Sequence, residues 1–90
     1  MLEIKATSRF KRDLKLAARR GWDFTGLETV VNQLSRQEAL PEKNRDHALS
    51  GDYEGCRECH IEPDWLLIYK ANQTELILYL MRTGTHSDLF

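Results

Sequence analysis

A chain of 90 residues with 41% hydrophobic and 30% charged residues is long enough for one modest core and too short for two, so we expect a single domain spanning residues 1–90. No apolar run approaches the ~18 residues of a membrane span and the first residues lack a secretory signal, so we expect a cytoplasmic protein with no membrane partner. The net charge is −1, but residues 1–45 hold ten of the 13 basic and six of the 14 acidic side chains, so positive charge is concentrated in the N-terminal half.

The first twenty residues predict a short strand followed by a strongly basic helix. Residues 1–6 alternate weakly, and residues 9–20 favour helix, with Gly21 well placed to end it. This helix carries one acid, Asp13, among six basic side chains: Arg9, Lys11, Arg12, Lys15, Arg19 and Arg20. The basic side chains are either a solvated face whose long stems cover apolar surface or an electrostatic footprint for a polyanion.

A second helix is expected to open at Asp23 or Thr25 and to fade before Pro41. Thr25 and Glu28 have the spacing of a capping box, in which each residue bonds the backbone of the other. Apolar residues at helical spacing predict one buried face: Leu27, Val30, Val31 and Leu34. Two amphipathic helices joined by a short link predict a helical hairpin, which needs an apolar partner from the C-terminal half.

The C-terminal half predicts a small sheet. Residues 65–69 and 75–81 are apolar on both faces and should form its central strands, joined by a turn. Residues 57–61 should form a neighbouring strand that breaks at residues 62–64, because Pro63 cannot donate a hydrogen bond to the next strand. Residues 46–49 form either a short edge strand or an ordered loop. The expected fold class is therefore α+β.

Beyond the second central strand, we expect Arg82 to stand at a strand end, followed by a glycine-containing turn over residues 83–86. A guanidinium in such a position could reach a phosphate. Ser87 is the expected cap of a final turn that ends at Phe90.

Histidines are the strongest candidates for chemistry. His47, His60 and His86 lie on three segments that the sheet would bring together, and an imidazole, with its ordinary pKa of about 6.5, suits acid–base catalysis at neutral pH. Strand alternation places Glu58 on the same face as His60, with Asp64 at the following corner. The alternative is a scattered set of surface histidines, and the residues alone do not tell an acid from a base.

The string Cys56-Arg57-Glu58-Cys59-His60 resembles a haem attachment site or the start of a zinc site, which His47 and His86 could complete. Haem attachment normally follows export, and a strand places the two cysteines on opposite faces. We therefore expect reduced cysteines, no metal and no cofactor.

Three blocks of the C-terminal half, taken together, resemble the YafQ-type toxins of the RelE family. They are Asp46-His47-x-Leu49-x-Gly51, then Gly55-x-Arg57-Glu58-x-His60-Ile61-Glu62-Pro63-Asp64-Trp65-Leu66-Leu67-Ile68-Tyr69-Lys70, and finally Arg82-Thr83-Gly84-Thr85-His86-x-x-Leu89-Phe90. The resemblance extends over essentially the full length, although the N-terminal half fits by its basic helical character more than by motif.

The resemblance implies a RelE-like fold, with an N-terminal strand and a two-helix hairpin packed on a small, twisted, mainly antiparallel sheet. It implies a type II toxin that acts as a ribosome-dependent, metal-independent mRNA endonuclease, producing a 2′,3′-cyclic phosphate and a 5′-hydroxyl. The implied partners are the 70S ribosome, mRNA and a cognate ribbon-helix-helix antitoxin, in a heterotetramer. A non-enzymatic ParE-like toxin that inhibits a protein such as gyrase is the alternative, and it would need no titratable cluster.

Family roles carried onto this chain make His47, His60, Asp64 and His86 the acid–base set. His86 would donate a proton to the leaving oxygen, and His60 or His47, oriented by Asp64, would act as the base.

Further roles follow from the same resemblance. Arg82 would stabilise charge on the phosphate, and Phe90 would stack on a base. Glu58 occupies a position where a relative has aspartate, so its role is at most accessory. The six basic side chains of helix 9–20 would bind ribosomal RNA.

Overall fold

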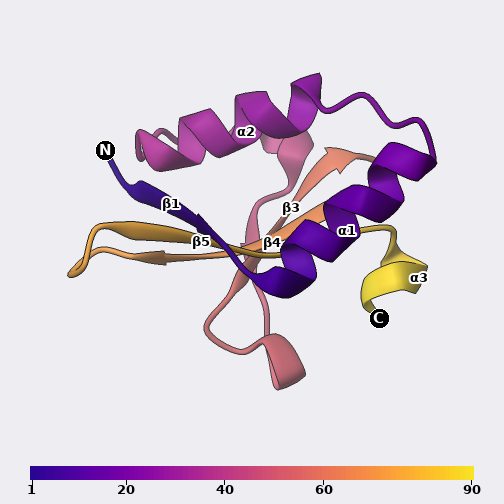
Figure 1. Ribbon diagram of the computed structural model, residues 1–90. Helices are drawn as coiled ribbons and strands as arrows, with labels where there is room; N and C mark the ends of the chain where they lie inside the picture. Colours follow the sequence, from indigo (N-terminus) through magenta and orange to yellow (C-terminus); the bar gives the residue numbers. More distant parts are fainter.

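The computed structural model describes residues 1–90 and confirms the α+β class. One sheet has the strand order β1-β5-β4-β3-β2 (Figure 1). Neighbouring strands are antiparallel, except that β1 runs parallel to β5. The strands are β1 (Glu3–Ala6), β2 (His47–Ala48), β3 (Arg57–Glu62), β4 (Trp65–Asn72) and β5 (Ile77–Gly84).

Helices cover both faces of this sheet. The longer helices α1 (Ser8–Arg19) and α2 (Thr25–Ser35) form the expected hairpin on one face, and the short helix α3 (His86–Leu89) lies beyond the end of β5 (Figure 1). Two short 3-10 helices, η1 (Glu42–Asn44) and η2 (Gly51–Tyr53), flank β2. None of the helices is long and apolar enough to cross a membrane.

Strand β4 is the centre of the molecule, as its composition predicts. Its residues Trp65 to Tyr69 are all buried, and alternate side chains enter two separate apolar clusters. Leu67 packs in the larger cluster beneath α1 and α2, whereas Leu66 and Ile68 pack with Leu89 of α3 on the other face. The burial of β4 on both faces of the sheet therefore explains why these residues are apolar at every position.

The helix ends follow local capping chemistry, with one correction. Thr7 caps α1 by accepting from the amide of Phe10, and Gly21 follows the helix at φ +76°. The predicted Thr25–Glu28 capping box is wrong. Oδ1 of Asp23 instead accepts from both the amide and the hydroxyl of Thr25, which satisfies one free donor of the first turn.

The last strand is displaced towards the C-terminus from its predicted position. It begins at Ile77, because Asn72 accepts from the amides of Thr74 and Glu75 and so extends the preceding turn. It ends at Gly84, so Arg82 lies within β5. The cap of the final turn is Thr85, which forms a capping box with Asp88; the expected Ser87 cap is wrong.

A bulge in β5 determines which way Arg82 faces. Tyr69 of β4 pairs with Leu80, but the preceding Ile68 pairs with Arg82, so Met81 is an extra residue in the ladder. Simple alternation would place Arg82 on the same face as Leu80, against α1 and α2. The bulge instead aligns Arg82 with Ile68, on the α3 side of the sheet.

Candidate active site

A row of contacts links the three histidines on the α3 side of the sheet. His47 pairs with Glu58 across β2 and β3, and His60 lies two residues further along β3 on the same face. Nε2 of His47 is 3.5 Å from Oε1 of Glu58, and Nε2 of His60 is 3.9 Å from the same oxygen. The ring centroids of His60 and His86 are 5.7 Å apart. The predicted convergence of the three histidines is therefore confirmed.

Glu58 stands at the middle of this row and is placed more centrally than its sequence position indicated. The residue is only 5% exposed, and its Oε2 atom has no hydrogen-bond partner. An unsatisfied buried polar atom costs roughly 1–3 kcal/mol. Because the fold gains nothing from such an atom, its position against two imidazoles favours a chemical role for Glu58. The signal in the sequence was its shared strand face with His60.

Asp64, in the turn between β3 and β4, holds His86. Its Oδ1 accepts from the backbone amide of His86 at 3.0 Å and from ring Nδ1 at 2.6 Å. These bonds, the backbone one foremost, keep the pKa of Asp64 below its usual range. Since a carboxylate only accepts, Nδ1 carries the proton and Nε2 is the ring atom left for a substrate. The resemblance led us to expect Asp64 beside His60 or His47; its partner in the structure is His86.

The segment around η1 positions the other two histidines through backbone bonds. Nδ1 of His47 is 2.7 Å from the carbonyl oxygen of Arg45, so it is the donor, and Nε2 faces Glu58. The side-chain amide of Asn44, which is buried, donates to the carbonyl of His60 at 2.7 Å.

Arg82 lies on the same face of the sheet as Glu58, since both pair with Ile68 of β4, but its guanidinium is engaged by α1. Its Nε and Nη2 atoms donate to the two oxygens of Asp13 at 2.7 and 3.1 Å, and these bonds raise the pKa of Arg82. Asp13 also accepts the amide of Thr83 at 3.1 Å. Nη1 makes only a long contact of 3.4 Å with the Tyr53 hydroxyl, so it is the guanidinium nitrogen left for a ligand. The single acid of the basic helix therefore orients Arg82.

Helix α3 is held in place by Arg20, the residue that caps the C-terminal end of α1. Arg20 donates to both carboxylate oxygens of Asp88 at 2.7 and 3.0 Å, and this pairing keeps the pKa of Asp88 well below its usual range. Asp88 in turn accepts the amide of Thr85, the residue before His86. The pair therefore holds the turn from which His86 projects.

Phe90 follows α3 at the edge of a hollow that Tyr53 and Arg9 also line. The residue is 66% exposed, and its ring meets the Tyr53 ring edge-on at a centroid distance of 5.6 Å. An exposed aromatic ring that is fixed on one edge is a suitable surface for stacking a base.

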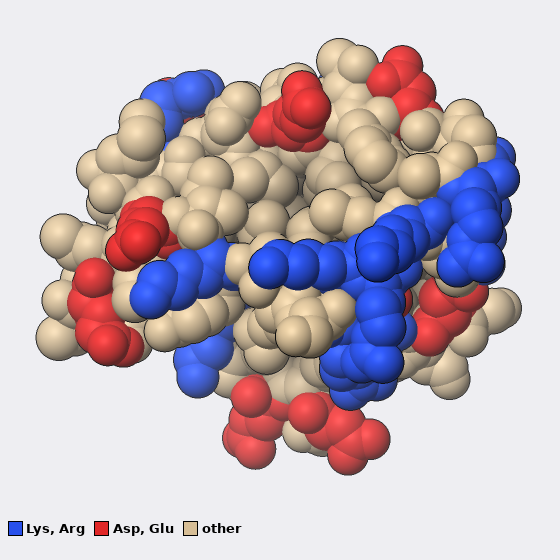
Figure 2. Space-filling view, viewed as in Figure 1, with Lys and Arg blue, Asp and Glu red and all other residues tan.

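The basic side chains of α1 form a band across the molecule (Figure 2). Five of the six predicted RNA-binding residues have no ion pair: Arg9, Lys11, Arg12, Lys15 and Arg19. Arg20 differs, because it is paired with Asp88 and its guanidinium lies 5.0 Å from the centroid of the Trp22 ring. Arg20 is therefore not one of the free cations of the band, since its charge is already paired.

The two cysteines lie apart from this site and from each other. Cys56 packs in the cluster beneath α3, and Cys59 packs in the cluster beneath α1 and α2. Burial raises the pKa of the Cys59 thiol to about 12, which makes it unreactive. No three or more His, Cys, Asp or Glu side chains are arranged as a metal-binding group.

Comparison with known proteins gives consistent similarities over the whole chain. Residues 2–90 match the family described as the bacterial toxin of type II toxin-antitoxin system, YafQ. The mRNA interferase toxin YafQ of Escherichia coli is 39% identical over 98% of this chain and 95% of its own. A metal-bound toxin from Helicobacter pylori is 41% identical, with a TM-score of 0.94 and full coverage of both chains. The structure of the E. coli DinJ–YafQ complex has a TM-score of 0.89 at 37% identity, covering 100% of this chain and 99% of that one.

Proposed function

The chain belongs to the YafQ family of toxins of bacterial type II toxin-antitoxin systems, and on this basis we propose that it is an mRNA interferase that cuts translated mRNA on the ribosome. The observation that carries the proposal is the continuous row His47–Glu58–His60–His86–Asp64, which gathers acid–base groups from four elements on one face. The name of the E. coli relative, an mRNA interferase toxin, agrees with this chemistry.

The proposed reaction is an attack by the 2′-hydroxyl on the adjacent phosphate. A base removes the 2′-hydroxyl proton as the O2′–P bond forms, and an acid protonates the 5′-oxygen as the P–O5′ bond breaks. The products are a 2′,3′-cyclic phosphate and a free 5′-hydroxyl. Both proton transfers can be made by side chains, so the proposed reaction needs no metal ion.

We assign the acid role to His86, because its Nδ1–H donates to Asp64, whose negative charge stabilises an imidazolium, and the second proton of that imidazolium, on Nε2, passes to the leaving 5′-oxygen. His60 or His47 takes the base role, with Glu58 between them as the anion that stabilises an imidazolium. Nη1 of Arg82 contributes positive charge at the phosphate while Asp13 holds the rest of the guanidinium.

A cognate antitoxin is the proposed protein partner. E. coli YafQ has been solved in complex with DinJ, and its toxin chain matches this one over its full length. We propose that a ribbon-helix-helix antitoxin neutralises this protein in a heterotetramer. Co-expression with the neighbouring antitoxin gene and a mass measurement on the purified complex test both statements.

The function is tested by inducing wild-type protein and the His86→Ala variant in bacteria and mapping mRNA ends. The wild type should stop growth and create new 5′ ends within translated frames, and His86→Ala should do neither while keeping its circular dichroism spectrum. Ser87→Ala, which changes the exposed neighbouring residue, is the matched control and should remain toxic. DNA damage without in-frame mRNA cuts would instead indicate a gyrase-directed toxin.

A further inference from the structure

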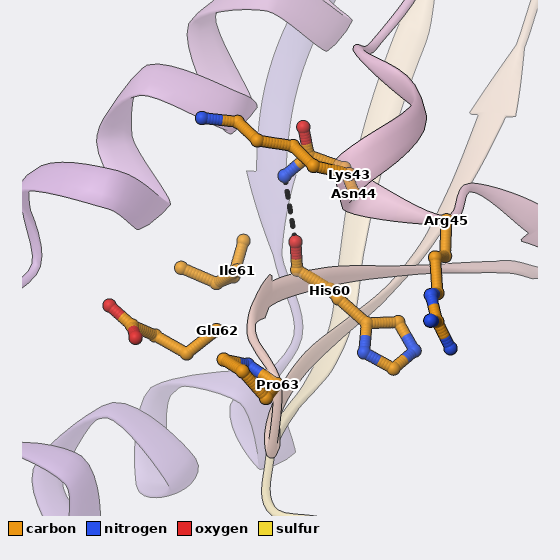
Figure 3. Close-up of a pocket in the computed structure, with 7 residues that line it drawn as sticks. All are labelled: Lys43, Asn44, Arg45, His60, Ile61, Glu62 and Pro63. Atoms are coloured by element: carbon orange, nitrogen blue, oxygen red, sulfur yellow. Dashed lines mark hydrogen bonds between the residues drawn. The ribbon is translucent and has the colours of Figure 1, made fainter.

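A polar hollow of about 420 Å³ opens beside the histidine row, between η1 and the end of β3 (Figure 3). Arg45 and the His60 ring line one side of it, and Lys43 and Glu62 extend on the other. The proposed proton transfers use only His60 among these residues. The rest of the hollow therefore has no role in the proposed proton transfers.

The backbone at Arg45 holds its side chain in an unusual position. Arg45 ends η1 with φ +48° and ψ +46°, in the left-handed region that residues other than glycine rarely adopt. Its amide donates to the carbonyl of Glu42, and its own carbonyl accepts from His47. Asn44, the preceding residue, is bonded to His60. The strained residue is thus bonded directly to His47 and is linked to His60 through its neighbour Asn44.

Arg45 also differs from Arg57 of β3 and Arg82 of β5, because no carboxylate engages its guanidinium. Arg57 is paired with Asp46 at 3.1 Å, and Arg82 is paired with Asp13 at 2.7 Å. Arg45 is exposed and belongs to no ion pair. A guanidinium with free donors is the side chain best suited to a phosphate, because it can donate two parallel hydrogen bonds.

We propose that this hollow is a subsite for an RNA phosphate adjacent to the scissile one, with Arg45 as its principal cation and Lys43 as a weaker one. The inference rests on the proposed function, since it assumes an RNA strand lying across His60. Glu62 at the far side disfavours an anion there, so the phosphate sits at the Arg45–His60 end. An RNA strand that reached His60 from this side would be bound at its neighbouring phosphate, and this contact would position the scissile phosphate before the proton transfers begin.

The test compares Arg45→Asn with Arg45→Lys in a His86→Ala background, so that binding is measured without cleavage. Asparagine removes the charge but tolerates the left-handed backbone, and lysine restores the charge without the paired donors. The probe is a ribosome programmed with a fluorescent mRNA. The control is Lys5→Gln, an exposed lysine on β1, at the opposite edge of the sheet from β2.

We expect Arg45→Asn to raise Kd about tenfold and to reduce the slope of log K against log salt by ~0.7, the value for one phosphate contact on a single strand. Arg45→Lys should recover much of the affinity, and Lys5→Gln should bind as the parent does. In the cleaving protein, the loss should be larger in KM than in kcat.

Unchanged Kd and salt slope in Arg45→Asn would overturn the subsite, even if cleavage were slower, because Arg45 would then act only through His47. This outcome differs from failure of the proposed function, in which the wild-type protein leaves ribosome-bound mRNA intact. The binding comparison decides the subsite in either case.

Discussion

Glu58 faces two imidazoles from inside the sheet, and one of its carboxylate oxygens has no hydrogen-bond partner. Replacing such a group by an apolar side chain of similar shape removes a desolvation penalty. We predict that Glu58→Met raises the free energy of unfolding by about 1 kcal/mol, while it lowers cleavage on programmed ribosomes at least tenfold. Urea unfolding and single-turnover cleavage, measured on the same preparation, check the two effects.

Glu58→Asp is the companion variant, since it keeps the carboxylate but moves it away from the two imidazoles by the length of one methylene group. Its activity should lie between those of the wild type and Glu58→Met. If Glu58→Met were both less stable and fully active, Glu58 would be a structural residue and its assignment to the site would be wrong.

Asp64 acts on His86 by accepting from both its amide and its Nδ1 atom. The lowered pKa of Asp64 means that its contribution to stability is present above the unfolded value of about 4 and is lost as the pH falls through the lower folded value. We predict that Asp64→Asn removes this part of the acid sensitivity and slows cleavage by about 10²-fold, the usual size of an acid–base contribution. Nitrogen chemical shifts of His86, read by NMR, should show a changed tautomer balance, and an unchanged balance would contradict the assignment.

Among the secondary-structure elements, α3 is too short to be stable by itself and depends on α1. Arg20 is paired with Asp88, and the pKa of Asp88 is lowered by this pairing. The stabilisation from the ion pair is therefore fully present above about pH 4 and is lost as the pH falls through the lower pKa of folded Asp88. We predict that Arg20→Gln lowers the free energy of unfolding near neutral pH, because it removes the ion pair with Asp88, and speeds amide hydrogen exchange in residues 86–90. Arg19→Gln removes an exposed charge without an ion pair and should change neither quantity; equal exchange in the two variants would refute this role of the ion pair.

Elements with one dominant pattern could be predicted from sequence alone. The apolar run of β4, the helical stripe of α2 and the glycine that follows α1 each have a short-range cause that operates in the final structure. The convergence of His47, His60 and His86 followed in turn from the predicted sheet.

Features that depend on one extra residue or one distant partner could not be predicted in this way. The bulge at Met81 turns Arg82 to the α3 side, although alternation along the strand would place it with Leu80. Asp13 was the lone acid among cations, and only its contact with Arg82, 69 residues away along the chain, gives it a function. Likewise the left-handed backbone at Arg45 has no signal in a sequence that lacks glycine there.

Over the whole molecule, the free cations of α1 and the acid–base groups occupy different elements. The band on α1 carries the charge that would attract ribosomal RNA, and the histidine row lies on the α3 side of the sheet. Asp13 and Arg20 join the two regions, because Asp13 connects α1 to β5 and Arg20, at the C-terminal cap of α1, is paired with Asp88 of α3. A small protein with an open site of this kind would depend on the ribosome to position its substrate.

The central claim is that the mRNA supplies its own nucleophile, the 2′-hydroxyl, and the most direct measurement is cleavage of ribosome-bound mRNA that carries a single 2′-deoxy nucleotide at the mapped site. The purified protein is first treated with EDTA and desalted. We predict that the unmodified mRNA is cut to a 2′,3′-cyclic phosphate and a 5′-hydroxyl, and that the 2′-deoxy mRNA stays intact at that site. Cleavage of the 2′-deoxy mRNA at the same position, or dependence of cleavage on restored metal, would contradict the mechanism.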